Sequence, residues 1–272
     1  MSESSPVLFV TGGASGIGAA CVQRFAAQGW RVAIGDLQEE KGRELAATLG
    51  ANVSFHRMDV RNEADFERAI GATVARWGRL DCMLNNAAIV GVIGPITEIA
   101  TEQFDLTCQI VLRSVFLGTK HALKAMQPAR RGTVVNIASV AGLITGFGPH
   151  VYNLCKAAVI HFTKSVAVEM AEHAIRVNAI CPGNVETPIH TGVTDARWKT
   201  RMEKIRREHF DDQPLPRMGL PEEIAEAAWW LANETSSYVT GHALVVDGGL
   251  TAGKAWRLQP QFLQEYHPVK IG

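Results

Sequence analysis

A tyrosine and a lysine with helical spacing form the most chemically informative pair in the sequence. Tyr152 and Lys156 stand at positions i and i+4, which share one face of a helix. A phenol has a reference pKa of about 10 and is a poor acid–base group at neutral pH. An ammonium roughly 5 Å away would favour the phenolate by about 3 kcal/mol, roughly two pKa units. Ser139 lies upstream, and its hydroxyl can hydrogen-bond a reacting carbonyl or alcohol oxygen, so the pattern indicates proton transfer.

Sequence context distinguishes this pair from a second pair with the same spacing. Tyr266 and Lys270 enclose Pro268 near the end of the chain, where a helix is not expected. Tyr152 instead opens an apolar-periodic run without proline or glycine. We therefore choose Ser139, Tyr152 and Lys156 as the candidate catalytic residues.

Short β-branched runs alternate with amphipathic segments of helix length along most of the chain. Strands are predicted at Val7–Thr11, Arg31–Asp36, Ser54–Met58, Cys82–Asn85, Gly132–Ile137, Ile175–Ile180 and Ala243–Val246. Helices are predicted near 16–28, 38–49, 63–76, 102–127, 151–172 and 221–232. This alternation predicts an α/β fold, a doubly wound parallel sheet of about seven strands with helices on both faces.

The same pass along the chain predicts a single domain. Residues 1–253 form the expected nucleotide-binding and catalytic domain, and 254–272 form a C-terminal tail. Residues 187–215 make an unusually long connection, which is typical of a lid or binding loop. Trp256, Phe262 and Tyr266 give the tail an apolar character, which predicts docking on the same or a neighbouring subunit.

The first predicted strand ends in a glycine-rich loop that leads into a helix. Gly12, Gly16 and Gly18 permit a tight turn and close backbone approach to a pyrophosphate at the helix N-terminus. Asp36 ends the second strand, where a carboxylate can accept hydrogen bonds from an adenosine ribose and repel a 2′-phosphate. Its neighbours Leu37 and Ser15 are neutral, so NAD is favoured over NADP. The alternative is that Asp36 only caps the next helix.

Composition narrows the possible partners. Formal net charge is zero, and no long stretch is dominated by basic residues, which argues against nucleic acid or an anionic membrane. We expect no signal peptide, no transmembrane segment and no metal site. The five cysteines form no C-x-x-C pair and are interpreted as buried free thiols, which fits a cytoplasmic protein.

Taken together, the motifs over residues 6–253 resemble the short-chain dehydrogenase/reductase family. The matching pieces are the Thr11–Gly18 loop, Asp59-Val60, Asn85-Asn86-Ala87-Ala88, Ser139 with Tyr152 and Lys156, Pro182–Thr187 and Asp247-Gly248-Gly249. The resemblance implies that Tyr152 is the general acid/base, that Lys156 lowers its pKa and holds the nicotinamide ribose, and that Ser139 positions the substrate oxygen. It also implies a homotetramer, with a homodimer as the alternative, and places helices 102–127 and 151–172 in one interface.

The resemblance and the loop together give a set of cofactor-binding residues. These are Gly12, Ser15, Gly16, Ile17, Gly18, Asp36, Leu37, Asp59, Val60, Asn86, Ala87, Ala88, Tyr152, Lys156, Pro182, Gly183, Val185 and Thr187. Two positions depart from the family pattern. Ala88 replaces a usual glycine, which matters only where the backbone needs positive φ. Val111 replaces an asparagine that the family uses to steady a water between the lysine and solvent.

The segments expected to form the substrate pocket are mostly apolar. They are residues 89–93, 143–147 and 184–193, which favours a cyclic or otherwise hydrophobic secondary alcohol or ketone. The predicted substrate-binding residues are Ser139, Phe147, His150, Tyr152, Asn184 and His190. The basic residues at 197–207 are read as a solvated helix face, with an anionic substrate as the alternative. Trp198, Met202 and Ile205 form a stripe that would face the pocket mouth or the core.

These features favour an NAD-dependent oxidoreductase that interconverts a secondary alcohol and a ketone by hydride transfer. One alternative is a NAD-binding regulatory or scaffold protein with weak or no turnover, which Val111 supports. A second is epimerisation through a transient ketone.

Overall fold

Seven parallel strands form one sheet at the centre of the molecule. The computed structural model describes residues 5–191, 197–208 and 213–265, and the sheet order is β3-β2-β1-β4-β5-β6-β7. The strands are β1 Val7–Thr11, β2 Arg31–Asp36, β3 Val53–Arg57, β4 Cys82–Asn85, β5 Gly132–Ile137, β6 Ile175–Pro182 and β7 Ala243–Val246. The predicted strands are confirmed, except that β3 begins and ends one residue earlier and β6 continues to Pro182.

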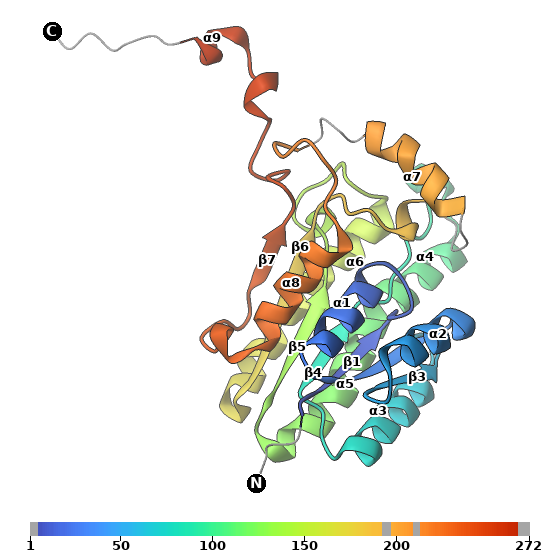
Figure 1. Cartoon of the computed structure of the whole chain (residues 1–272). Helices are drawn as coiled ribbons and strands as arrows, with labels where there is room; N and C mark the ends of the chain where they lie inside the picture. The colour runs from blue at the N-terminus through green and yellow to red at the C-terminus, as the bar shows by residue number, and fades with distance from the viewer. Residues whose placement is uncertain (1–4, 192–196, 209–212, 266–272) are drawn as a thin grey trace, which may run out of the picture.

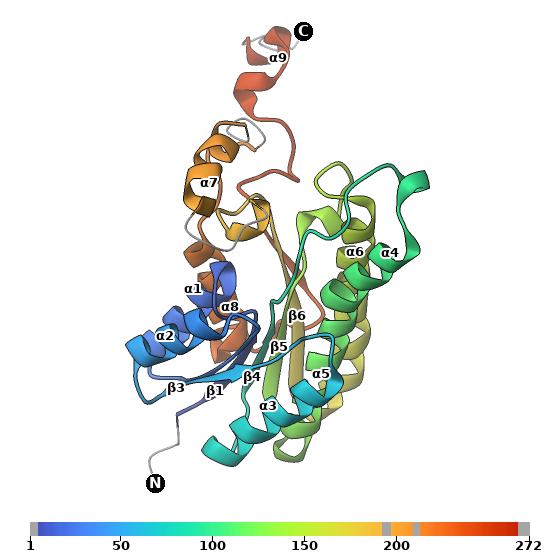
Figure 2. The same cartoon turned by 90° about the vertical axis from the view of Figure 1, so that its right-hand side faces the viewer.

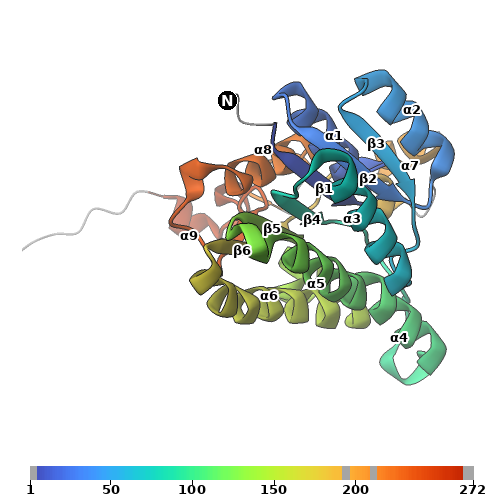
Figure 3. The same cartoon turned by 90° about the horizontal axis from the view of Figure 1, so that it is seen from below.

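Helices cover both faces of the sheet, as Figures 1, 2 and 3 show from three directions. One face carries α1 Gly16–Ala27, α2 Glu39–Leu49 and α8 Pro221–Ala232. The other carries α3 Glu63–Trp77, α5 Ser114–Met126 and α6 His150–Met170. The remaining described α-helices are α4 Thr101–Cys108, α7 Arg197–Glu208 and α9 Gln261–Gln264. This arrangement confirms the predicted doubly wound fold.

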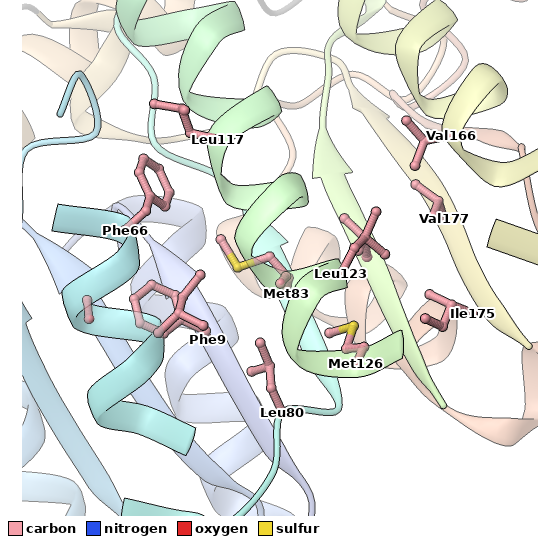
Figure 4. Packing of buried hydrophobic residues seen from close by; sticks show 14 of the residues in the cluster. Phe9, Phe66, Leu80, Met83, Leu117, Leu123, Met126, Val166, Ile175 and Val177 are labelled. Carbon is pink, nitrogen blue, oxygen red and sulfur yellow. The ribbon is translucent and has the colours of Figure 1, made fainter. Parts of the chain in front are cut away.

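Burial on both faces explains why the strands read as continuous apolar runs. Every residue of β1 is buried, since successive side chains alternate between the two helix layers. Phe9 packs with Phe66 and Met83 under α3 and α5 (Figure 4). Leu8 packs in the opposite cluster under α1 and α8. Each such side chain contributes about 1.5–3 kcal/mol of apolar burial.

The helix predicted over 102–127 is interrupted, so that prediction was wrong in its middle. A π-helical turn at Gln109–Arg113 separates α4 from α5, and the Ser114 N–H donates to the Gln109 carbonyl five residues back. The turn includes Val111, which is completely buried against Val151. Apolar periodicity could not reveal the change, because the pattern tolerates one extra residue in a single turn.

The C-terminal tail packs little against the rest of the described chain. The tail after Gly253 projects from the body of the molecule (Figures 1 and 2), with Trp256 and Phe262 each 65% exposed. Docking of these rings on the same subunit is therefore not observed, and Tyr266 and Lys270 lie outside the described residues. Over the described ranges, every helix is too short or too polar to cross a bilayer.

Candidate active site

Glycine is required in the loop between β1 and α1 for two physical reasons. Gly12 and Gly16 have φ of +65° and +53°, in the left-handed region that side chains disfavour. At Gly18, an added Cβ would lie 2.1 Å from the Gly12 carbonyl oxygen. The loop therefore keeps its backbone close to the N-terminus of α1, where free N–H groups can bind a phosphate. Ser15 and Ile17 lie within the same turn.

Residues after β4 fasten this loop. The Asn86 side-chain amide donates to the carbonyls of Thr11 and Gly12, at 3.0 Å each. The backbone N–H groups of Asn86 and Ala87 donate to the Thr11 hydroxyl at 3.0 and 3.2 Å. Thr11 was missed as a functional residue, although a hydroxyl at the end of an apolar strand was a visible signal. The predicted cofactor residues at 86–88 thus lie against the glycine loop.

The segment after β6 also reaches this loop. A Cβ at Gly16 would lie 3.3 Å from the Thr187 methyl, so the two segments of the chain are in close contact. Gly183 donates its N–H to the Val246 carbonyl at 3.0 Å, which holds the segment to β7. Pro182 is the last residue of β6, and Val185 is buried beside it in the core under α1 and α8. The structure brings Thr187 of this predicted group of cofactor residues to the glycine loop.

Asp36 is engaged by the backbone on both sides. Its two carboxylate oxygens accept the N–H groups of Ala14 and Gln38, each at 2.9 Å. The carboxylate therefore joins the glycine loop to the start of α2, as the alternative reading of a local cap partly expected. Each oxygen retains a further lone pair for a ribose hydroxyl.

A cation near Asp36 was overlooked in the sequence. The Gln38 side-chain amide donates to the Ser15 hydroxyl at 3.2 Å. The Lys41 ammonium donates to the side-chain oxygen of Gln38 at 3.0 Å. Lys41 is thus two hydrogen bonds from Ser15. The argument that only neutral side chains surround this position was wrong, because it considered Leu37 and Ser15 but not the next turn of α2.

Asp59 and Val60 follow β3 closely in the sequence. Their side chains contact other residues of the protein. The Arg61 guanidinium lowers the pKa of Asp59 by hydrogen bonding to its carboxylate. Val60 packs into the core with Phe66. Their contact with an adenine stays a prediction.

The three candidate catalytic residues converge at the ends of β5 and α6. Ser139 lies two residues after the end of β5, and its hydroxyl accepts the Ala141 N–H at 3.1 Å. Hydrogen bonding by the same hydroxyl acts to lower the pKa of Tyr152. The Lys156 ammonium lies 5.5 Å from the centre of the Tyr152 ring. It donates to the Ile137 carbonyl at 2.7 Å, so the end of β5 fixes its position.

Burial dominates the protonation of this group. Desolvation raises the pKa of Tyr152 to about 12, and the hydrogen bond with Ser139 acts in the opposite direction. Lys156 is 2% exposed, and burial lowers its pKa to about 8, against the effect of Cys155 and Cys181. The expectation that Lys156 brings the pKa of Tyr152 below its usual value was wrong. Both charged forms lose solvation in this setting, and that loss outweighs their attraction.

A buried polar network supports the site from below. The Asn85 amide donates to Asn136 at 2.8 Å, and the Asn136 amide donates to the Thr163 hydroxyl at 2.9 Å. These bonds link β4, β5 and α6, the elements that carry the site. Asparagines inside apolar strands were the signal, because a buried amide requires partners.

The two departures from the family pattern have different outcomes. In the described ranges, the only non-glycine residues with positive φ are Arg130 and Ala174, so Ala88 needs no glycine. Val111 packs in an apolar cluster with Cys155 and Tyr152 and presents a hydrocarbon where the family has an amide.

The predicted substrate residues differ in exposure and in the surface that they line. Phe147 is 41% exposed, and His150 and His190 are exposed. A Cβ at Gly148 would lie 3.1 Å from the Tyr152 ring, so the loop after β5 folds over the tyrosine. Asn184 lines a cavity of about 140 Å³ whose lining includes none of the other predicted substrate residues. Its lining residues are Asn184, Gln213, Leu215, Arg217, Gly219, Glu223, Ile224, Val246, Asp247 and Gly248.

The segment predicted as a lid contains α7. Glu186 binds Arg206 through two hydrogen bonds of 2.6 and 2.5 Å, which tie α7 to the end of β6. Met202 is completely buried, as the apolar stripe predicted. Arg197, Lys199 and Lys204 are exposed, in agreement with a solvated face.

Comparison with known proteins agrees with this geometry. A family model described as enoyl-(acyl carrier protein) reductase matches residues 12–251. (+)-Borneol dehydrogenase 2 of Salvia officinalis is 39% identical over 90% of this chain and 89% of its own. Cyclopentanol dehydrogenase of Comamonas testosteroni is 36% identical over 90% and 97%. The solved structure "ElxO with NADP Bound" has a TM-score of 0.84 and 30% identity over 92% of this chain and 100% of that one.

The fold and the family model define an oxidoreductase. The chain belongs to the short-chain dehydrogenase/reductase family.

Proposed function

We propose that the protein interconverts a cyclic or otherwise hydrophobic secondary alcohol and the corresponding ketone, with NAD as cofactor. The observation that carries this proposal is the convergence of Ser139, Tyr152 and Lys156 after β5, at the same edge of the parallel sheet as the glycine loop after β1. The glycine loop fits a bound dinucleotide, because its tight turn, which a Cβ at Gly18 would block, keeps the backbone at the N-terminus of α1, where free N–H groups would bind a pyrophosphate.

The residues divide the chemistry between them. A bound nicotinamide would accept or supply the hydride at the substrate carbon. Ser139 would hydrogen-bond the substrate oxygen, and Tyr152 would exchange a proton with it through its phenolic oxygen. Because the pKa of Lys156 is about 8, it stays mostly protonated at neutral pH, and its charge would offset part of the desolvation that opposes the Tyr152 phenolate.

Exposed apolar side chains support the substrate class. Ile93 is 76% exposed in the loop after β4, and Leu143 and Phe147 are 43% and 41% exposed in the loop after β5. Two relatives are named for cyclic alcohols, borneol and cyclopentanol. Oxidation of a panel of hydrophobic, polar and anionic secondary alcohols, followed by absorbance of the reduced cofactor, tests the proposal. Faster turnover of the polar or anionic members would contradict it.

The choice of NAD rests on Asp36. Its carboxylate repels a 2′-phosphate, whereas Lys41 could attract one and the relative ElxO is named with NADP. We expect a higher kcat/KM with NAD, and a ratio of NAD to NADP efficiency that falls about tenfold or more in Asp36→Ala. The exposed Glu44→Ala on α2 is the control. A wild-type preference for NADP would overturn the assignment.

A regulatory NAD-binding protein is the second candidate, since Val111 places a hydrocarbon beside Cys155 and Tyr152 where the family has an amide. Tight NADH binding without turnover on the whole alcohol panel would favour it.

We also propose a cytoplasmic homotetramer. Phe116, Leu154 and Val168 expose 48%, 52% and 81% of their surface on α5 and α6, and all five cysteines are free. Sedimentation of wild type and Leu154→Glu checks the assembly, and a monomeric wild type would contradict it.

A further inference from the structure

Two thiols from different elements meet beside the catalytic helix. The Sγ atoms of Cys108 and Cys155 are 3.7 Å apart. Cys108 is the last residue of α4, immediately before the π-helical turn, and Cys155 lies on α6 next to Lys156. The two residues are far apart in sequence, so only the fold brings them together.

Access differs between the two sulfur atoms. Cys155 is completely buried, whereas Cys108 is partly exposed. Burial, reinforced by Cys108, raises the pKa of the Cys155 thiol to about 12. An oxidant from solvent therefore meets Cys108 first, and Cys155 is placed to react second.

The surroundings favour reaction between the two sulfurs. Val111 and Val151 form the core of the cluster around Cys155, and Val92, Ile99 and Leu112 pack against it. These hydrocarbon side chains limit access of a second oxidant molecule or an external thiol to an oxidised Cys108. The partner already within 3.7 Å is Cys155.

We propose that Cys108 and Cys155 form a redox-sensitive modification site, which closes to a disulfide with hydrogen peroxide as oxidant. The Cys108 thiolate attacks one peroxide oxygen, the O–O bond breaks, and a sulfenic acid and hydroxide form. The Cys155 sulfur then attacks the sulfenic sulfur, the S–O bond breaks, and water leaves with the thiol proton. The two sulfurs lose two electrons, and the peroxide gains them.

Closure acts on the catalytic residues through α6. A disulfide needs its sulfurs about 2.05 Å apart, so they must approach by roughly 1.7 Å. Cys155 lies in the helical turn between Tyr152 and Lys156, so its displacement toward α4 shifts both side chains relative to Ser139. We expect turnover to fall at least tenfold on oxidation and to recover with a reducing agent. This activity effect rests on the proposed function, whereas disulfide formation does not.

The experiment uses the full-length protein treated with hydrogen peroxide and then alkylated under denaturing conditions. Peptide mapping by mass spectrometry should find Cys108 linked to Cys155, with monomer mobility on a non-reducing gel. Cys21→Ala, which removes a cysteine buried elsewhere, is the matched control and should retain the link. Cys108→Ala should keep wild-type turnover before treatment and keep it after peroxide.

The outcomes distinguish a failure of the modification site from a failure of its coupling to catalysis. Absence of the Cys108–Cys155 link, or a link between two chains, overturns the modification site whether or not the protein turns over alcohols. A link with unchanged turnover overturns the coupling to catalysis. If peroxide inactivates Cys108→Ala as fast as it inactivates wild type, the peroxide acts elsewhere. That result overturns the coupling as well.

Discussion

The nucleotide side and the substrate side of the active site differ in what fixes their shape. On the nucleotide side, backbone conformation and hydrogen bonds hold Gly12, Asp36 and Asn86 in place. On the substrate side, loops present exposed apolar side chains such as Ile93 and Phe147. A cofactor shared by many reactions requires a constant cradle, whereas a substrate pocket can change through single side chains on loops. The catalytic residues lie on the rigid elements between the two.

The largest effect is expected where the two sides meet. Tyr152→Phe removes the phenolic oxygen that exchanges the proton, so kcat should fall about 10²–10⁴-fold while NADH affinity is kept. Steady-state kinetics and fluorescence titration with NADH measure the two quantities. Tyr238→Phe changes a fully exposed tyrosine and should have no effect. Unchanged turnover in Tyr152→Phe would remove the basis of the mechanism.

The next largest effect is expected from a change that disrupts the glycine loop on the nucleotide side alone. Gly18→Ala places a Cβ 2.1 Å from the Gly12 carbonyl oxygen, which forces the loop to move. We expect at least tenfold weaker NADH binding and a loss of about 2–3 kcal/mol in the free energy of unfolding. Gly71→Ala, on α3 with open space around it, is the control and should gain about 0.5–1 kcal/mol. Equal NADH affinity in both variants would contradict the cradle.

The pH dependence of stability tests the burial of Lys156, which lies on α6 between the two sides. The pKa of Lys156 is lowered from 10.5 to about 8, so the unfolded chain binds more protons between these values. The free energy of unfolding contributed by Lys156 should therefore rise with pH, by about 2 kcal/mol between pH 7 and pH 9.5. Urea unfolding of wild type and Lys156→Met measures it as their difference. The exposed Lys164→Met is the control, and a pH-independent difference for Lys156→Met would refute the assignment.

The smallest effect on turnover is expected at Val111. An asparagine there buries an amide in an apolar cluster, which should cost about 1–3 kcal/mol of stability and change kcat less than about threefold. Val111→Ala separates the loss of packing from the added polarity. A markedly faster Val111→Asn variant would show that the valine limits proton transfer.

Sequence patterns predicted the parts of the molecule that depend on local spacing. Apolar runs between turn residues identified the strands, and the Tyr152–Lys156 spacing identified a pair that does share one face of α6. The glycines of the loop were visible because left-handed backbone and close approach both select glycine.

Other features depend on contacts between distant segments and could not be read in this way. The pKa of Tyr152 follows from burial by surrounding side chains, which spacing does not contain. Lys41 reaches Ser15 only through Gln38, and Asn184 turns toward Gln213 rather than Tyr152. The pairing of Cys108 with Cys155 has the same origin.

The position of β1 has a consequence for synthesis of the chain. β1 leaves the ribosome first, yet it lies between β2 and β4, and β4 begins only at Cys82. Until then, one edge of the apolar strand Val7–Thr11 lacks its native neighbour and can pair with the edge of another nascent chain. Aggregation during expression is therefore a hazard of the stage of translation before β4 is made, when no candidate catalytic residue has yet been added.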